Sequence, residues 1–240
     1  MIGTHRVSAI VTCAGRATRF GSNKLLVPID GVSVLERTVR QVVHPLIDEV
    51  VVTVNADFRG VYRKILVEDA GLPVTLVDGG SERFVSAWNG LAATTGDIVL
   101  VHDGVRPFVR SEHIERVLEA GVSEGAAMLG IPTVVQLKLV DDDEYVTGSL
   151  DRAHSWLGQT PQVFRRDLLE HAYRAALRSE YRRVSDDADL VAEFTGHRVR
   201  IVLGDDDNIK ITTRNDLALA EVIQRRRSGS GAGADVSSQP

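Results

Sequence analysis

The sequence lacks several features that would point to particular classes of protein. Cys13 is its one cysteine, which excludes a disulfide framework and a zinc site built from cysteines. A single cysteine suits a reducing compartment, so we expect a cytoplasmic protein. No apolar run approaches the roughly 20 residues that span a bilayer. The first apolar run is also too short for a signal peptide, so we expect no contact with a membrane.

An excess of positive charge is missing as well. The 28 lysines and arginines are outnumbered by 33 aspartates and glutamates, which gives a net charge of -5. This balance argues against nucleic acid as a partner. The dinucleotide pattern GxGxxG, the Walker ending GK[ST], the zinc motif HExxH and a serine in a nucleophile elbow are also absent. These absences disfavour a nicotinamide-dependent oxidoreductase and a serine hydrolase.

The residues that are present predict an α/β fold. Four short runs rich in Val, Ile and Leu suit a parallel sheet that is covered on both faces. They span residues 7–13, 49–54, 74–77 and 97–102, and helical patterns lie at 33–43, 60–69, 82–94 and 112–122. Ser81 and Ser111 are candidate N-caps. Alternation of strands and helices predicts a mostly parallel, doubly wound sheet with its ligands at the carboxyl ends of the strands.

The pattern changes after residue 131. Two β-rich runs, 133–140 and 144–149, flank an acidic turn at Asp141–Asp143 and predict a hairpin. Their apolar side chains have little nearby to bury them, which favours a protruding arm, about 133–153, that pairs with another subunit. The alternative is a hairpin folded on its own domain.

The rest of the chain returns to alternating elements. It predicts helices at 167–178 and 187–194, strands at 198–203 and 209–212, and a helix at 214–226 that begins with Thr213 and Asp216 in a capping box. We expect one domain over residues 1–226. The remainder, 227–240, has almost nothing to bury and is expected to be a disordered tail.

The first loop, AGRATRFGSNK, contains small residues and cations without an acidic residue. Ala14, Gly15 and Ala17 allow the backbone to close on a ligand, while Arg19 and Lys24 reach in. Backbone N–H groups with two or three cations form a polyphosphate site. The alternative is that these cations are solvated surface residues.

The loops after the next strands contain residues suited to a nucleotide and a metal. DGGSER at 78–83 offers Gly80 for close backbone approach, with Ser86 one helical turn further on. A simple tight turn is the alternative interpretation. In LVHDGVRPF, Asp103 at a strand end is placed to hold Mg²⁺ on phosphates. The alternative is a turn in which Asp103 pairs with Arg106. From the late segment DDDNIKITT, Lys210 would add another cation and share a strand face with Asn208.

Together, AGRATRFGSNK, DGGSERFVS, VHDGVRPF and LDRAHSWLGQTPQVF…DNIKIT follow the order and spacing of one family. From about residue 7 to residue 224 the chain resembles the 2-C-methyl-D-erythritol 4-phosphate cytidylyltransferases. The resemblance implies a Rossmann-like nucleotidyltransferase fold, a homodimer with a β-arm swapped between subunits, CTP, Mg²⁺ and a sugar-alcohol phosphate as acceptor. It implies catalytic roles for Arg19, Lys24 and Lys210, nucleotide contacts from Ala14, Gly15, Gly80, Ser86, Gly104 and Arg106, acceptor contacts from Lys138, Arg152 and Thr160, and Asp103 as metal ligand.

Three positions depart from the family pattern, and the last of them bears on the acceptor. Ala17 replaces a glycine, NKLL at 23–26 replaces the usual PKQ, and Val135 and Gln136 stand where the arm usually has Asp and Thr. A cytidylyltransferase acting on ribitol 5-phosphate or another polyol phosphate is therefore one alternative, and a non-catalytic nucleotide-binding dimer is a second. In either transferase the acceptor phosphate is already ionised at neutral pH, because its second pKa is about 6, so no general base is required.

Overall fold

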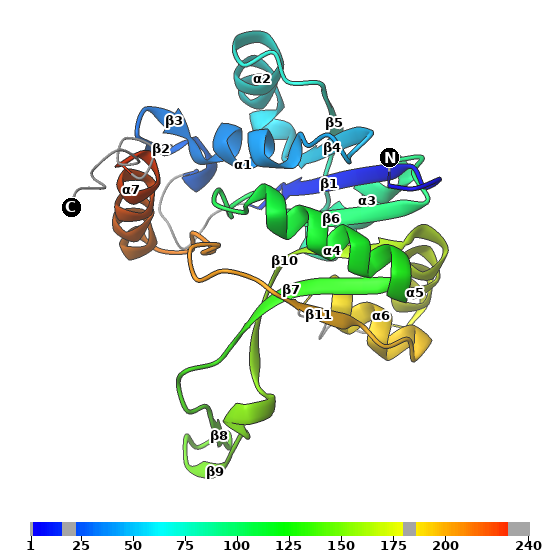
Figure 1. The fold of residues 1–240 in the computed structure, drawn as a ribbon, viewed down its shortest axis with the longest axis vertical. Coiled ribbons are helices and arrows are strands. Elements are labelled where there is room, and N and C mark those ends of the chain that lie inside the picture. Colours follow the sequence, from blue (N-terminus) through cyan, green and yellow to red (C-terminus); the bar gives the residue numbers. More distant parts are fainter. Residues whose placement is uncertain (1, 16–22, 180–185, 230–240) are drawn as a thin grey trace, which may run out of the picture.

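The short apolar runs of the sequence form four adjacent strands on one side of a seven-stranded sheet in the computed structural model, which describes residues 2–15, 23–179 and 186–229 (Figure 1). The strands are β1 (Val7–Cys13), β4 (Glu49–Val54), β5 (Val74–Asp78), β6 (Ile98–Asp103), β7 (Ala126–Pro132), β10 (Trp156–Arg165) and β11 (Arg200–Leu203). Their order in the sheet is β11–β7–β10–β6–β1–β4–β5. All are parallel to their neighbours except β10, which is antiparallel to both β6 and β7. The predicted α/β class with a mostly parallel sheet is confirmed.

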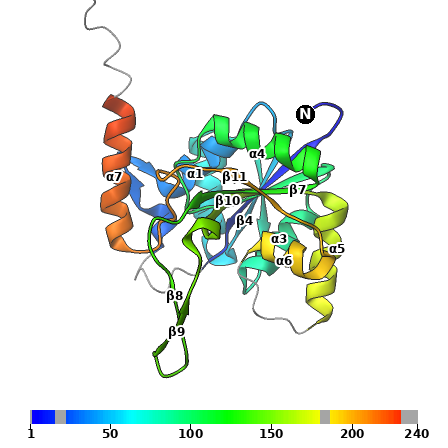
Figure 2. The same ribbon diagram turned by 60° about the horizontal axis from the view of Figure 1, so that its bottom comes forward.

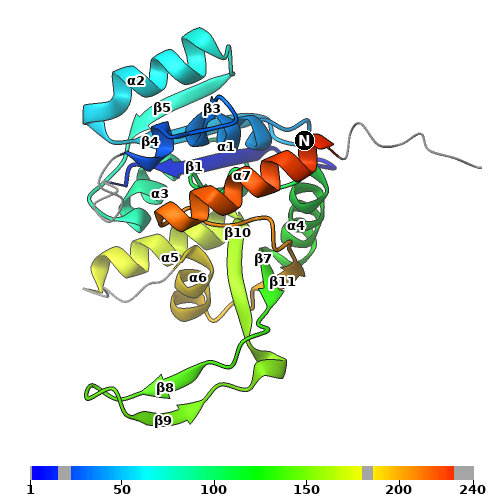
Figure 3. The same cartoon turned by 90° about the vertical axis from the view of Figure 1, so that its left-hand side faces the viewer.

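Two hydrophobic cores lie on opposite faces of this sheet, because side chains alternate along each strand. Val99 and Val101 of β6 belong to one core, and Ile98 and Leu100 to the other. The core that contains Ile98 is covered by α1 (Val34–Val42), α2 (Arg59–Arg63), α4 (Ser111–Glu124) and α7 (Arg214–Gly229). The second core is covered by α3 (Arg83–Ala92), α5 (Arg166–Arg178) and α6 (Asp187–Thr195). Figure 3 shows the two helical layers. No helix in the described ranges is both long and apolar enough to cross a bilayer.

Several element predictions are wrong in detail. Strands β7 and β10 were not predicted, because their small, polar and glycine residues hide the apolar pattern. The predicted strand at 209–212 is a loop. Ser81 lies before the N-cap of α3, and Ser111 is the first residue of α4 rather than its cap; neither cap residue, Glu82 or Arg110, makes a side-chain capping bond.

Other helix boundaries also differ from the predicted ones. The helix expected at 60–69 divides into α2 and a π-helical turn, Lys64–Asp69. At the start of α7, the carboxylate of Asp216 accepts from the backbone N–H groups of Thr213 and Thr212, which is one half of the predicted capping box. The helix continues to Gly229, past its predicted end at 226. The rest of the predicted tail, 230–240, lies outside the described residues.

The predicted hairpin protrudes from the sheet between β7 and β10 (Figure 2). It comprises β8 (Lys138–Val140) and β9 (Val146–Ser149), both shorter than predicted, followed by a 3₁₀ turn at Arg152–His154. We call residues 133–153 the β-arm. The β-arm contains seven of the fourteen large hydrophobic residues that are exposed in the described ranges: Val134, Val135, Leu139, Val140, Tyr145, Val146 and Leu150. Its surface is therefore much more apolar than that of the rest of the chain.

Candidate active site

A pocket of about 360 Å³ opens where β1, β5 and β6 end. The parallel arrangement of these strands brings their following loops together, although the loops are far apart in the sequence. The lining residues are Thr12–Gly15, Asn23–Leu25, Gly80–Arg83, Ser86, Asp103, Val105, Lys210 and Thr212. The volume falls within the range of small-molecule sites. The three loops singled out from the sequence thus contribute to one cavity.

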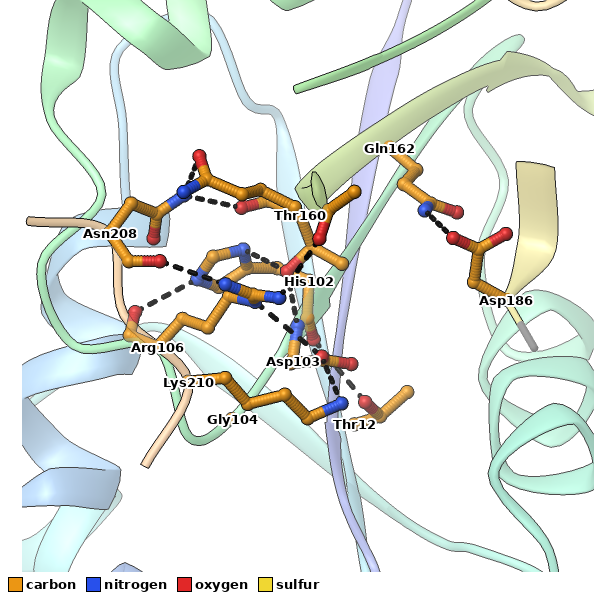
Figure 4. A network of polar contacts seen from close by, with 12 residues as sticks. Thr12, His102, Asp103, Gly104, Arg106, Thr160, Gln162, Asp186, Asn208 and Lys210 are labelled. Atoms are coloured by element: carbon orange, nitrogen blue, oxygen red, sulfur yellow. Dashed lines mark hydrogen bonds and ion pairs between the residues drawn. The ribbon is translucent and has the colours of Figure 1, made fainter. Parts of the chain in front are cut away.

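Asp103 ends β6 and is only 5% exposed, with three cations around its carboxylate. Nε of Arg83 donates to Oδ1 at 3.0 Å. Nζ of Lys210 lies 2.9 Å from Oδ2, and Nε of Arg106 lies 3.6 Å from the same oxygen. Figure 4 shows Lys210 and Arg106 directed at Asp103 from the same side. The alternative interpretation from the sequence, a turn in which Asp103 pairs with Arg106, accounts for only one of these three contacts.

The two oxygens of Asp103 have different environments. Burial would raise the pKa of this carboxyl, but Arg83, Lys210 and Arg106 outweigh burial and hold the pKa well below its ordinary value. Oδ1 faces Arg83, whose side chain is 27% exposed, whereas Oδ2 faces Lys210, whose side chain is 43% exposed. Lys210 can thus leave Oδ2 more readily than Arg83 can leave Oδ1.

Beneath Asp103 lies a buried chain of hydrogen bonds through His102 and Thr160. The backbone N–H of Asp103 donates to Thr160 Oγ1 at 3.0 Å, and that hydroxyl is 3.0 Å from His102 Nδ1. Nε2 of His102 lies 3.1 Å from the carbonyl of Arg106, so Nε2 carries the proton and Nδ1 accepts from Thr160. Burial lowers the pKa of His102 to about 4, which keeps the ring neutral. Thr160, for which a contact with the acceptor phosphate stays a prediction, holds the end of β6 in this chain.

Lys210 lies on a loop that is anchored at several points. Asn208 is fully buried and donates to the carbonyl of Thr160 at 2.9 Å, while its own carbonyl accepts from Arg106 at 2.8 Å. The N–H of Ile211 donates to the carbonyl of Val105 at 2.9 Å. The prediction that Asn208 and Lys210 share a strand face is wrong, because this segment is a loop with Asn208 buried inside and Lys210 half exposed to the pocket.

Asp207 anchors the same loop to the end of the chain. Its carboxylate pairs with Arg110, Arg226 and Arg227, the last two from α7. Nη2 of Arg227 also donates to the carbonyl of Phe108 at 2.9 Å. Helix α7 therefore fixes the loop that presents Lys210.

Two glycines, one in the pocket lining and one next to Asp103, are required by close packing. A Cβ on Gly80 would lie 2.2 Å from Val85 Cγ1, and one on Gly104 would lie 2.3 Å from Cys13 Sγ and 3.0 Å from the carbonyl oxygen of Thr12. Any other residue would push these loops apart. Ser86 is 3% exposed, and its hydroxyl accepts from the N–H of Gly80 at 3.0 Å and donates to the carbonyl of Glu82 at 3.0 Å. This hydroxyl shapes the glycine loop.

The donor set around Asp103 suits a magnesium ion held jointly with a ligand. The described ranges contain no group of three or more His, Cys, Asp or Glu residues that could hold a metal alone. Magnesium needs only one or two carboxylates when substrate phosphates supply further oxygens. Asp103 is ionised and lines the pocket, and its Oδ2 faces a side chain that can move. The residues present therefore fit the ion.

The structure brings most predicted site residues together and separates others. Ala14, Gly15, Lys24, Gly80, Ser86, Asp103 and Lys210 line the pocket, and Gly104 and Arg106 adjoin Asp103. Arg19 and Ala17 lie outside the described residues. Lys138 and Arg152 lie on the β-arm, away from the pocket lining.

Sequence reasoning assigned no role to Arg83, although it follows the two glycines of DGGSER directly after Ser81 and Glu82. A cation at the first turn of a helix after a glycine loop was the available signal. Its partner Asp187, at the start of α6, gave no signal, because only folding brings these two residues together.

Comparison with known proteins gives one consistent result. Residues 7–226 match the family model described as 2-C-methyl-D-erythritol 4-phosphate cytidylyltransferase. A curated relative of that name from Pelotomaculum thermopropionicum is 38% identical over 231 residues, covering 93% of this chain and 96% of the relative. One from Clostridium botulinum is 36% identical over 225 residues, covering 92% of this chain and 100% of the relative.

Solved structures agree with the sequence comparison. The crystal structure of 4-diphosphocytidyl-2C-methyl-D-erythritol synthase from Anaerococcus prevotii has a TM-score of 0.82 and 32% identity, covering 92% of this chain and 96% of that one. The 2-C-methyl-D-erythritol 4-phosphate cytidylyltransferase of Thermus thermophilus has a TM-score of 0.77 and 33% identity, covering 92% and 99%. The similarity thus extends over nearly the whole of each protein.

Proposed function

The chain belongs to the 2-C-methyl-D-erythritol 4-phosphate cytidylyltransferase family, and from this premise we propose how its pocket carries out the reaction of that family. The reaction is the transfer of CMP from CTP to the phosphate of 2-C-methyl-D-erythritol 4-phosphate, with release of pyrophosphate, in the non-mevalonate route to isoprenoids. The observation that carries the proposal is the carboxylate of Asp103 at the end of β6, with Lys210, Arg106 and Arg83 around it.

The nucleotide occupies the pocket formed by the loops after β1, β5 and β6. Backbone at Ala14 and Gly15, with the loop at Gly80 that Ser86 holds, receives the cytidine. Lys24 and Lys210 line the same cavity and are placed to neutralise the triphosphate, and Arg19 is assigned the same role from its sequence position. Gly104 allows the close approach of the β1 and β6 loops, and Arg106 holds the Lys210 loop. Fixed cations act most strongly where charge accumulates, on the departing pyrophosphate.

Asp103 is the residue that would hold Mg²⁺, and the bound ion would supply charge neutralisation at the phosphates. Lys210, 2.9 Å from Oδ2 and half exposed at the pocket, is placed to contact the phosphates. Asp103 remains ionised throughout the neutral range, because the surrounding cations hold its pKa low.

The acceptor phosphate attacks the α-phosphate of CTP directly. The attacking oxygen is already ionised near neutral pH and needs no base. The nearest histidine fits this scheme, because His102 is fully buried and both of its ring nitrogens are hydrogen-bonded. Catalysis therefore rests on bringing two polyanions together in line and on neutralising their charge.

The acceptor half of the site comes from the β-arm of a second subunit. Lys138 and Arg152 cannot serve a pocket that they do not line within their own chain. Seven exposed hydrophobic residues on the β-arm favour its burial against a partner. A homodimer with exchanged arms accounts for both observations. Thr160 is assigned to the acceptor from its sequence position, and within the chain it also supports Asp103. The cytoplasmic location remains a prediction from the single cysteine.

A pyrophosphate-release assay tests the function. CTP and Mg²⁺ are supplied with 2-C-methyl-D-erythritol 4-phosphate, ribitol 5-phosphate or erythritol 4-phosphate, and the products are identified by mass spectrometry. We expect turnover with the first acceptor to exceed that with the others by an order of magnitude or more. Preference for ribitol 5-phosphate would transfer the assignment to the alternative acceptor that Val135 and Gln136 suggested. Nucleotide binding without turnover on any acceptor would indicate a non-catalytic dimer.

A further inference from the structure

Arg83 connects two buried carboxylates that lie far apart in the sequence. Its Nε donates to Oδ1 of Asp103 at 3.0 Å, and its Nη1 donates to Oδ2 of Asp187 at 2.8 Å. Asp103 is 5% exposed and Asp187 is fully buried. One guanidinium group thus makes charge-assisted hydrogen bonds to both, a geometry that lysine cannot reproduce.

Asp187 is itself held on its other side. Its Oδ1 accepts from the hydroxyl of Tyr173 on α5 at 2.6 Å. The neighbouring Asp186 accepts from Gln162 of β10 at 2.8 Å, and the N–H of Ala188 donates back to Gln162 at 3.0 Å. The start of α6 is therefore fixed to the sheet and to α5. Because Asp187 cannot move freely, the position of Arg83 is determined from outside the pocket.

In this arrangement an anchored guanidinium holds Oδ1 of Asp103, whereas Oδ2 faces the half-exposed Lys210 and, at 3.6 Å, Nε of Arg106. We propose that Arg83 is a positioning residue: anchored by Asp187, it holds Oδ1 of Asp103 so that Oδ2 faces the metal and the phosphates. The inference rests on the proposed role of Asp103 as metal ligand. Supporting groups of this kind orient a ligand for its metal, and their replacement weakens metal affinity by about 10- to 100-fold.

The test uses a binding measurement that is independent of turnover. Calorimetry gives the CTP dissociation constant in EDTA and in Mg²⁺, and the ratio of the two measures the gain in affinity that depends on the metal. The variants are Arg83→Lys, which keeps the charge but not the two-point contact, and Asp187→Asn, which keeps Arg83 but weakens its anchor. Asp103→Asn sets the scale. Arg165→Lys is the matched control, because Arg165 also makes a two-point contact, with Asp167, but on the surface away from the pocket.

We expect Asp103→Asn and Arg83→Lys each to reduce the ratio about tenfold or more. Asp187→Asn should reduce it by a smaller factor, and Arg165→Lys should leave it unchanged. A purely structural role for Arg83 would lower the melting temperature and weaken CTP binding equally with and without Mg²⁺, leaving the ratio constant, and would overturn the inference.

Two further outcomes separate the inference from the proposed function. If Asp103→Asn reduces the ratio while Arg83→Lys and Asp187→Asn do not, the positioning role is wrong and the metal site stands. If Asp103→Asn itself leaves the ratio unchanged, the metal assignment is wrong, and the inference about Arg83 falls with it. Should Arg83→Lys fail to fold, Asp187→Asn decides by the same criterion.

Discussion

The pocket and the β-arm are built on opposite principles. In and beside the pocket, the two buried carboxylates are matched within the chain: Asp103 by three cations, and Asp187 by Arg83 and Tyr173. On the β-arm, apolar side chains such as Val134, at 84% exposure, and Tyr145, at 73%, stand in the open.

This contrast separates side chains that find their partners within one chain from side chains that need another surface. Buried charges are costly unless they are paired, so the pocket must be preorganised before any nucleotide arrives. Exposed apolar groups are stabilised only by contact with another surface. The pocket is thus formed within one chain, whereas the apolar β-arm needs another surface, which in our proposal is a second subunit that completes the acceptor half.

Among the variants that test this contrast, Lys210→Ala is expected to have the largest effect on activity. Lys210 is 43% exposed on its side chain, so the fold should persist, while loss of its charge should lower kcat on the order of a hundred- to a thousandfold. Steady-state kinetics with melting curves measure both properties. Lys64→Ala is the matched control, because Lys64 pairs with Asp69 at 2.7 Å on the surface. A well-folded Lys210→Ala enzyme with normal kcat would remove this residue from the mechanism.

The second prediction concerns the stability of the protein in acid, because the buried hydrogen bonds beneath Asp103 include His102. Burial lowers the pKa of His102 to about 4, from 6.5. Between these values the unfolded chain binds more protons than the folded one, so the free energy of unfolding falls as the pH falls from 6.5 to 4. The loss of stability caused by His102 approaches about 3 kcal/mol below pH 4 and is negligible above pH 6.5.

Denaturant unfolding of the wild type and His102→Gln at several pH values measures this contribution. The variant should be less stable at pH 7, because one buried hydrogen bond is lost, but should depend less on pH between 6.5 and 4. Parallel profiles for the two proteins would show that His102 does not titrate with unfolding.

A third prediction concerns the apolar surface of the β-arm. Val140 and Val146 face each other across the hairpin, so Val140→Glu with Val146→Lys replaces an apolar pair by an ion pair and preserves the hairpin. We expect dissociation to a monomer, with loss of acceptor turnover but retention of CTP binding. Light scattering and calorimetry measure these quantities.

The control for the β-arm lies on α7. Leu219 and Val222 are similarly exposed, at 48% and 55%, and are three residues apart on the helix, so Leu219→Glu with Val222→Lys makes an equivalent change. This variant should keep the oligomeric state of the wild type. A wild type that is monomeric at micromolar concentration would contradict the exchanged-arm dimer.

The smallest effect should follow Arg152→Ala, which removes one exposed cation from the β-arm. We expect the KM for the acceptor to rise about tenfold, the equivalent of one charged hydrogen bond. The KM for CTP should stay within twofold of the wild type. The reverse pattern would contradict the division between a nucleotide half in the pocket and an acceptor half on the β-arm.

Prediction from the sequence succeeded where a local pattern was sufficient. The Val-rich β1 and β4, the helices between them, the acidic turn of the hairpin and the loop cations all have signals within about ten residues. It failed for β7 and β10, whose pairing with each other compensates for a weak apolar pattern, and for residues 209–212, where anchoring of Asn208 replaced strand formation. The contacts of Arg83 and Thr160 were missed because their partners lie about 20 to about 100 residues away.

The sequence alone therefore determined the family, the α/β class and the residues that can neutralise a triphosphate, since these depend on residue types and their order along the chain. The tertiary structure decided which cation each oxygen of Asp103 faces, and that Lys138 and Arg152 lie outside the pocket of their own chain. The physical reason is that hydrogen bonds and ion pairs act over a few ångströms in space. Separation along the chain does not reveal which groups folding will bring that close.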